Sequence, residues 1–286
     1  MSVAADVPRG TPIKGPTALG SDPRRLWQLS WLLAVTEFKL RFFGSVLGYL
    51  WQLMRPLLLF GVLYVVFSVF FEAGTNVPYF AVSLLLGIVL FHFFAEATGG
   101  SVRSLVEREN LVRKIEFPRL AVPMSRVLTA LLNLSLNLIP VMVFLLIAGG
   151  RPRWSWLEMP FVLGFLVLFT LGVAMAVSSL YVQYRDVDPI WDVFTQIIFY
   201  ASPILYTLQT VQEKASPQVM NILAANPFTT AMQQARHAML GPGHYSASQA
   251  IGGEVRLLVP ATIALLTFAL GFVVFDRRAA RIAEDL

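Results

Sequence analysis

The chain has 286 residues, no cysteine and a formal net charge of +5, and 56% of its residues are hydrophobic. Charged residues make up 14% of the chain, where about 25% is typical of soluble proteins, and the mean hydropathy is +0.66. These values exclude an ordinary soluble enzyme, a disordered chain and a disulfide-stabilised scaffold. The basic excess is explained more simply by Lys and Arg in the cytoplasmic loops of a membrane protein than by nucleic-acid binding.

The first 48 residues precede any apolar run of membrane length. Residues 1–21 are rich in Pro, Gly and small polar residues and lack the apolar core of a signal peptide, so we expect a flexible cytoplasmic tail. Residues 22–48 mix Leu and Phe with charged residues, and Trp27 and Trp31 are four positions apart. Cations mixed with Trp and Phe predict an amphipathic helix in the cytoplasmic interface. The alternative is an early start of the first membrane span.

Six apolar runs that follow are long enough to cross about 30 Å of hydrocarbon. The backbone finds no hydrogen-bond partners in lipid, so each run is expected to form a helix. The predicted fold class is therefore an all-α polytopic membrane protein with a domain over residues 49–286. Its spans are expected at about residues 50–71, 77–97, 124–148, 159–182, 190–211 and 256–275.

Lys and Arg are distributed unevenly between the two sides of these spans. One side holds 15 of them: Arg9, Lys14, Arg24, Arg25, Lys39, Arg41, Arg103, Arg108, Arg113, Lys114, Arg119, Arg185, Arg277, Arg278 and Arg281. The other side holds four: Arg151, Arg153, Lys214 and Arg236. Since cytoplasmic segments carry the excess of positive charge, both termini are expected in the cytoplasm of a protein in the plasma (inner) membrane.

Two connections between the spans are informative. The loop over residues 100–119 carries charges of both signs around apolar residues, which fits a short amphipathic helix. Its charge pattern is equally consistent with a solvated loop and with a docking surface for a cytoplasmic partner. The connection between the fifth and sixth spans has helix-like stretches over residues 219–225 and 229–240. A connection this long usually has structure of its own, and we expect two short helices at the outer face.

A few polar side chains interrupt the apolar runs. Glu96 and Arg126 lie at similar depth in the second and third spans, and each would be costly alone, so we expect them to form a pair. Arg55 lies about one turn into the first span, where its long side chain is expected to extend to the cytoplasmic surface. His92 is expected to be a packed residue, because three histidines in the whole chain are too few for a metal site.

Sequence motifs for chemistry are missing. The chain has no G-x-x-x-x-G-K-[ST], H-E-x-x-H or G-x-S-x-G motif, so we expect no P-loop nucleotide site, metal or other cofactor on this chain. The aromatic residues of the first and fifth spans fit lipid contact, and they also fit a channel that stacks against sugar rings. The candidates for such a channel are Tyr64, Phe67, Phe70, Phe71, Phe194, Phe199, Tyr200 and Tyr206.

Several short motifs resemble those of ABC-2 type permeases, and the closest branch is the exporters of O-antigen, capsule and teichoic-acid polysaccharides. Residues 41–51 (RFFGSVLGYLW) followed by Pro56 resemble the signature at the start of the first span. Residues 109–119 (ENLVRKIEFPR) with Pro123, and residues 184–187 (YRDV), match further motifs in order. So do residues 202–206 (SPILY) and residues 226–228 (NPF) with Arg236. Gly44 departs from the family pattern, which commonly has a larger polar residue there.

The resemblance implies the permease half of an ATP-driven exporter of a lipid-linked polysaccharide, and not an enzyme. Such permeases are homodimers, and two copies of a separate cytoplasmic P-loop ATPase bind the ATP and Mg. Residues 22–48 and 101–115 would be the coupling elements, and residues 216–245 the external gate helices. The residues expected to couple to the ATPase are Arg41, Glu107, Arg108, Glu109, Asn110, Arg113, Lys114, Arg185 and Asp186. The alternatives are an ABC-2 exporter of a drug or small lipid, and a membrane-embedded glycolipid enzyme.

Overall fold

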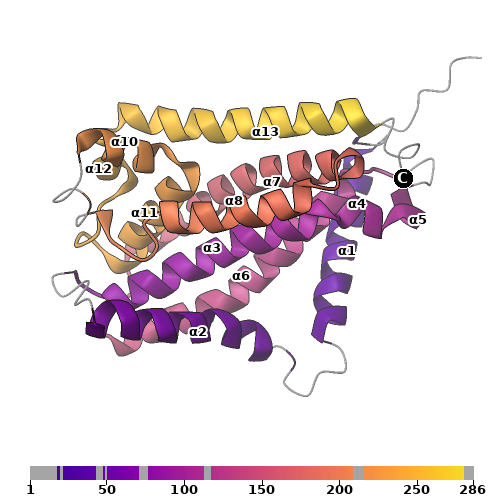
Figure 1. Ribbon diagram of the computed structural model, residues 1–286. Helices are drawn as coiled ribbons and strands as arrows, with labels where there is room; N and C mark the ends of the chain where they lie inside the picture. Colours follow the sequence, from indigo (N-terminus) through magenta and orange to yellow (C-terminus); the bar gives the residue numbers. More distant parts are fainter. Residues whose placement is uncertain are drawn as a thin grey trace, which may run out of the picture.

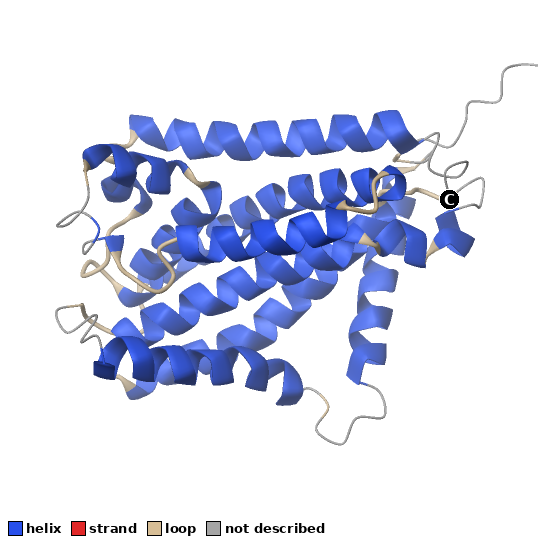
Figure 2. Cartoon of the chain, viewed as in Figure 1, coloured by secondary structure: helices blue, strands red, loops and turns tan. Residues whose placement is uncertain are grey.

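Every regular element that the structure describes is a helix (Figure 2). The structure is a computed structural model, and it describes residues 18–19, 22–42, 48, 50–70, 77–112, 117–208, 211 and 216–279. No strand occurs within these ranges. The predicted all-α fold class is therefore confirmed.

Among the described residues, five helices are long and apolar enough to cross a membrane. They run back and forth along one direction in Figure 1. These helices are α2 (Leu50–Tyr64) with the π-helix η1 (Val65–Phe70), α3 (Phe80–Val102), α6 (Ala121–Ile147), α7 (Met159–Gln183) after η2 (Trp154–Glu158), and α13 (Leu258–Ala279) after η3 (Val255–Leu257). Helix α3 is central, because 78% of its apolar window is buried, against 17% in α2 and in α13.

Helix α8 (Val187–Ala201) is shorter than the span expected over residues 190–211. It has 15 residues, or about 22 Å at 1.5 Å per residue. The helix ends because Pro203 has no N–H and disfavours a helical conformation at the preceding residue, and Ser202 is indeed extended, with ψ 145°. Residues 202–208 then continue as an irregular, largely buried segment.

Arg236 of α11 (Pro227–Leu240) holds this irregular segment in place. Its side chain is 2% exposed and donates to the carbonyl oxygens of Pro203 at 2.7 Å and Ile204 at 3.1 Å. It also donates to the carbonyl of Ser83 in α3 at 3.2 Å. Gly87 makes room for it, since a Cβ there would lie 2.8 Å from the guanidinium. Burial lowers the pKa of Arg236 to about 9.

Short helices at the same end of the bundle begin at local capping signals (Figure 1). Helix α10 (Pro217–Ala225) and helix α11 both start with proline, whose fixed φ suits the first helical position. The Asn226 side chain accepts a hydrogen bond from the Phe228 N–H, which caps α11. Helix α12 (Ala247–Ile251) starts with a capping box between Ser246 and Gln249.

Two histidines tie the end of α11 to the turn before α3. His244 is 2% exposed, and its Nε2–H donates to the Pro78 carbonyl at 2.8 Å. The Nδ1–H of His237 donates in turn to the His244 carbonyl at 2.8 Å. Burial lowers the pKa of His244 to about 4, so the ring is neutral at pH 7.

Helix α1 (Pro23–Phe42) crosses the other long helices at a steep angle (Figure 1). Ser30 and Ala34, four positions apart on one face, are completely buried. Their small side chains allow a close approach to α6, where the Thr129 hydroxyl donates to the Ala34 carbonyl at 3.3 Å. Trp27 and Trp31 stack on each other, with ring centroids 6.4 Å apart, and are about half exposed.

Candidate functional site

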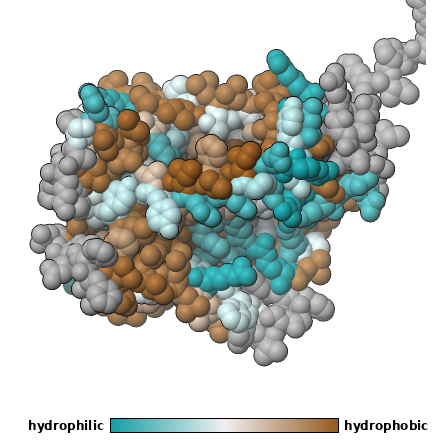
Figure 3. Space-filling view, in the orientation of Figure 1, coloured by the Kyte–Doolittle hydropathy of each residue, from teal (hydrophilic) through white to brown (hydrophobic). Residues whose placement is uncertain are grey.

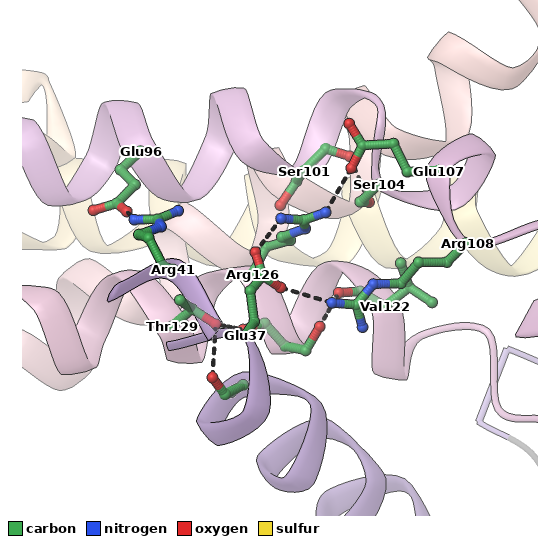
Figure 4. A network of polar contacts seen from close by, with 12 residues as sticks. Glu37, Arg41, Glu96, Ser101, Ser104, Glu107, Arg108, Val122, Arg126 and Thr129 are labelled. Carbon is green, nitrogen blue, oxygen red and sulfur yellow. Dashed lines mark hydrogen bonds and ion pairs between the residues drawn. The ribbon is translucent and has the colours of Figure 1, made fainter. Parts of the chain in front are cut away.

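The most charged part of the described bundle lies where α1 meets α6 and the short helix α4 (Ser104–Glu107) (Figure 4). Glu37 of α1 accepts a hydrogen bond from Arg108 at 2.7 Å and forms an ion pair with Arg126 of α6. Arg126 also donates to Glu107 at 2.6 Å. We call Glu37, Glu107, Arg108 and Arg126 the Glu37 cluster.

The local sequence explains how the Glu37 cluster is assembled. Glu37 follows Ala34 by three positions, so it continues the face of α1 that packs on α6. Arg126 lies one turn before Thr129 on α6, at the level of that contact. Arg108 is the residue at which α4 ends and α5 (Glu109–Val112) is about to begin. The cluster therefore joins three elements that are distant in the sequence.

Charges in the Glu37 cluster balance, with two carboxylates and two guanidinium groups. The side chains of Glu37, Arg108 and Arg126 are only 16–17% exposed. Burial lowers the pKa of Arg108, and the carboxylate of Glu37 opposes that shift. Removing one partner of such a buried pair leaves an uncompensated charge, which typically costs about 3–5 kcal/mol. The cluster thus resists separation of α1, α4 and α6.

A second ion pair joins α1 to α3. Arg41 pairs with Glu96, whose Oε1 also accepts from the Asn133 amide at 2.7 Å. Nε2 of His92 lies 3.9 Å from the other Glu96 oxygen. The expected pairing of Glu96 with Arg126 is absent among the described contacts, because α1 places a complementary charge next to each of them. Sequence spacing in the spans gave no sign that α1 would supply both partners.

The remaining coupling candidates occupy two places. Asn110 is exposed and Glu109 is half-buried in α5, while Arg113 and Lys114 lie outside the described residues. Arg185 and Asp186 lie in the exposed turn before α8, with the Arg185 guanidinium 4.9 Å from the centre of the Tyr181 ring. The structure therefore brings Glu107 and Arg108 into the Glu37 cluster and leaves Arg185 and Asp186 apart from it.

Asp188 connects the start of α8 to the start of α4. It accepts hydrogen bonds from Arg103, at 2.9 Å for the Nε donor. This hydrogen bond and the negative charge of Asp188 raise the pKa of Arg103. The Arg103 side chain is 59% exposed, so this pair orients the loop more than it stabilises the fold.

Two of the aromatic candidates line a common cavity. Phe199 and Tyr200 of α8 border a cavity of about 400 Å³ between α2, α3 and α8. Phe194 is 53% exposed on α8 and does not contribute to this lining. Tyr206 follows the end of α8, and its hydroxyl donates to the Tyr200 carbonyl at 3.4 Å.

The other aromatic candidates belong to the first predicted span. Tyr64 stacks on Phe60, with ring centroids 5.6 Å apart, and Phe67 packs partly buried against the core. Phe71 and the side chain of Phe70 lie outside the described residues. None of the described candidates in this span borders the 400 Å³ cavity.

A polar cavity of about 770 Å³ adjoins the apolar one. Both cavities are bordered by Arg55 and His92. The polar cavity is also lined by Arg41, Gly48, Trp51, Gln52 and Glu96. Figure 3 shows hydrophilic side chains set back between the hydrophobic surfaces of α2 and α8. Arg55 therefore faces a hollow in the protein, an arrangement the sequence did not predict.

Comparison with known proteins relates the chain to transporters. The model of the ABC-2 type transporter family matches residues 28–240. An O-antigen export system permease protein RfbA from Myxococcus xanthus is 32% identical over 213 residues, covering 73% of this chain and 80% of the relative. A protein of the same description from Klebsiella pneumoniae is 27% identical over 262 residues, covering 91% and 96%. The polysialic acid transport protein KpsM of Escherichia coli is 21% identical over 247 residues, covering 86% and 92%.

The family match covers most of the chain, including the greater part of α1, the Glu37 cluster, both cavities and α11. Its residues 28–240 also span the motifs whose resemblance was noted in the sequence. With five apolar helices long enough to cross a membrane, the chain is a membrane protein that belongs to the ABC-2 type transporter family.

Proposed function

We propose that this protein is the permease subunit of an ATP-driven exporter that moves a lipid-linked polysaccharide across the plasma (inner) membrane. The observation that carries the proposal is the similarity to an O-antigen export permease over 91% of the chain. The absence of a P-loop motif from this sequence is consistent with ATP hydrolysis on a separate polypeptide. In the proposed assembly, two copies of this chain work with two cytoplasmic P-loop ATPase subunits that bind ATP and Mg.

The proposed topology has six crossings, with α8 as the fifth. Helix α8 alone covers about 22 Å of a hydrocarbon core about 30 Å thick. Residues 202–208 would complete the crossing, because irregular backbone is tolerated at membrane depth when protein surrounds it. The hydrogen bonds from Arg236 to the Pro203 and Ile204 carbonyls supply partners that lipid would not.

In this topology, α1 would lie in the cytoplasmic interface, and α4 and α5 would contact the ATPase. The steep angle of α1 and its exposed Trp27 and Trp31 support an interfacial position (Figure 1). The excess of Lys and Arg at this end supports a cytoplasmic location. We propose that movement of α4 on the ATPase is transmitted through the Glu37 cluster to α1 and α6, because the cluster joins these elements by buried charge pairs.

The experiment that tests the export function is deletion of the gene, with complementation by the wild-type chain as the control. We expect lipid-linked glycan to accumulate inside the cell and to disappear from the surface. Surface glycan that is unchanged, without internal accumulation, would refute the polysaccharide substrate and favour export of a drug or small lipid. Co-purification of a P-loop ATPase with the tagged chain tests the partner separately.

A further inference from the structure

The polar cavity contains one positive charge that no described carboxylate neutralises. Arg41 pairs with Glu96, and His92 lies beside the same carboxylate. Arg55 has no ion pair or hydrogen bond with any residue that the structure describes. The adjacent residues 43–49 contain no Asp or Glu, so they offer no anion either. The cavity is therefore suited to an anionic ligand.

Gln52 adds an unused hydrogen-bond donor to this cavity. Its side chain is 5% exposed, and Nε2 finds no acceptor among the described residues. Gln52 and Arg55 are three positions apart, so they lie on the same face of α2. A buried donor without a partner is unfavourable, and an anion at Arg55 would supply the missing acceptor.

The adjoining cavity indicates what is attached to the anion. Leu59, Leu63, Phe91 and Phe199 form much of its lining, and it meets the polar cavity at Arg55 and His92. Both volumes fall in the range of about 300–1,000 Å³ found for ligand pockets. A ligand that fills both cavities needs a charged head and an apolar part next to it.

We propose that Gln52, Arg55 and His92 bind the phosphate of an amphiphile whose apolar part occupies the cavity lined by Phe91 and Phe199. A phosphate offers several oxygens to the forked guanidinium and to the N–H donors of the other two side chains. The phosphate can belong to a bilayer lipid or to the linkage between a glycan and its lipid. The second source rests on the proposed export function.

The test is titration calorimetry with the full-length chain in phosphatidylcholine nanodiscs, corrected for empty nanodiscs. The probes are dihexanoyl phosphatidic acid and, as the neutral control, dihexanoylglycerol. We expect the phosphatidic acid to bind more tightly than the neutral probe, and Arg55→Gln to weaken it by about tenfold or more. The matched control is Arg151→Gln, an exposed arginine outside both cavities, which should bind like the wild type.

Gln52→Leu separates a ligand-binding role from a structural one. Because the substitution removes an unsatisfied buried donor, we expect a higher melting temperature together with weaker binding of phosphatidic acid. A lower melting temperature with unchanged binding would show that Gln52 serves the fold. Equal affinity for the charged and neutral probes, or wild-type affinity in Arg55→Gln, would overturn the proposal.

A third probe distinguishes the two sources of the phosphate. N-acetylglucosamine joined through a diphosphate to a farnesyl chain should bind more tightly than phosphatidic acid if the site recognises a lipid-linked glycan. Equal affinities assign the site to phosphate lipids of the bilayer. These measurements need neither the ATPase nor export, so a failed deletion phenotype leaves them interpretable. A change of oligomeric mass in Arg55→Gln with unchanged binding would assign Arg55 to contact with a second copy and overturn the proposal.

Discussion

Glu37 forms ion pairs with two guanidinium groups, those of Arg108 and Arg126. Replacing it with Gln removes the charge that both Arg108 and Arg126 face. We expect the free energy of unfolding to fall by about 1–3 kcal/mol, because Arg108 loses its carboxylate partner, whereas Arg126 keeps its ion pair with Glu107. Thermal unfolding of the purified protein in detergent measures this loss.

Two further variants control the Glu37 prediction. Arg103→Gln removes an exposed partner of Asp188 and should leave the melting temperature almost unchanged, because exposed ion pairs contribute little to stability. The double variant Glu37→Gln/Arg126→Gln should lose less stability than the sum of the two single variants, since the pair is already broken in each. Additive losses would show that Glu37 and Arg126 act independently.

His244 gives the protein a specific dependence on pH. Burial, together with the nearby positive charge of Arg236, lowers its pKa from 6.5 to about 4 in the folded state. Above pH 6.5 the imidazole is neutral in both the folded and the unfolded state, so its full contribution to the free energy of unfolding is present. As the pH falls from 6.5 to 4, His244 is protonated in the unfolded state but not in the folded state. This favours the unfolded state, and the free energy of unfolding declines by about 3 kcal/mol in total.

The comparison of His244→Gln with the wild type isolates this effect. Glutamine keeps an N–H donor for the Pro78 carbonyl and does not titrate. Between pH 7.5 and pH 5, the melting temperature should therefore fall more in the wild type than in the variant. An equal fall in both proteins would assign the acid sensitivity to other groups.

At the scale of elements, α7 and α13 pack closely because each has a glycine at their crossing. A Cβ at Gly271 would overlap the carbonyl oxygen of Gly172, and a Cβ at Gly172 would lie 2.6 Å from the Cα of Phe268. We expect Gly271→Ala to destabilise the protein by about 1–3 kcal/mol, as overpacking typically does. The control is Gly164→Ala in α7, whose Cβ would meet nothing within 4 Å. Equal melting temperatures for the two variants would contradict a close crossing.

Predictions from the sequence were reliable where one physical signal acts along a continuous segment. Uncharged apolar runs predicted the helices α3, α6 and α7, because backbone in lipid must form its own hydrogen bonds. The break after α8 was missed although Pro203 marks it, because the uncharged apolar run continues past Pro203. The contacts of the following segment with Arg236, far along the chain, could not be seen in the sequence. The partners of Glu96 and Arg126 were also missed, because an ion pair across helices requires knowing how α1 packs.

Across the whole molecule, the described ion pairs, cavities and buried cation occupy separate places along the bundle. Helix α1 lies toward one end of the bundle, and α10, α11 and α12 lie at the other (Figure 1). The ion pairs of α1 include Arg41 and Glu96 (Figure 4), which also line the polar cavity with Arg55 and His92. The apolar core around α3 lies between the two ends.

The number of crossings can be tested on the whole chain, which has no cysteine of its own. Single cysteines at the exposed positions Arg24, Arg151, Asp186 and Glu254 sample both ends of the bundle. In spheroplasts, a membrane-impermeant maleimide should label Arg151→Cys and Glu254→Cys, whereas Arg24→Cys and Asp186→Cys should react only after permeabilisation. Labelling of Glu254→Cys from the same side as Asp186→Cys would show that α8 does not cross. The short α8, the irregular residues 202–208 and Arg236 would then form a re-entrant hairpin, and the chain would have five spans with its termini on opposite sides.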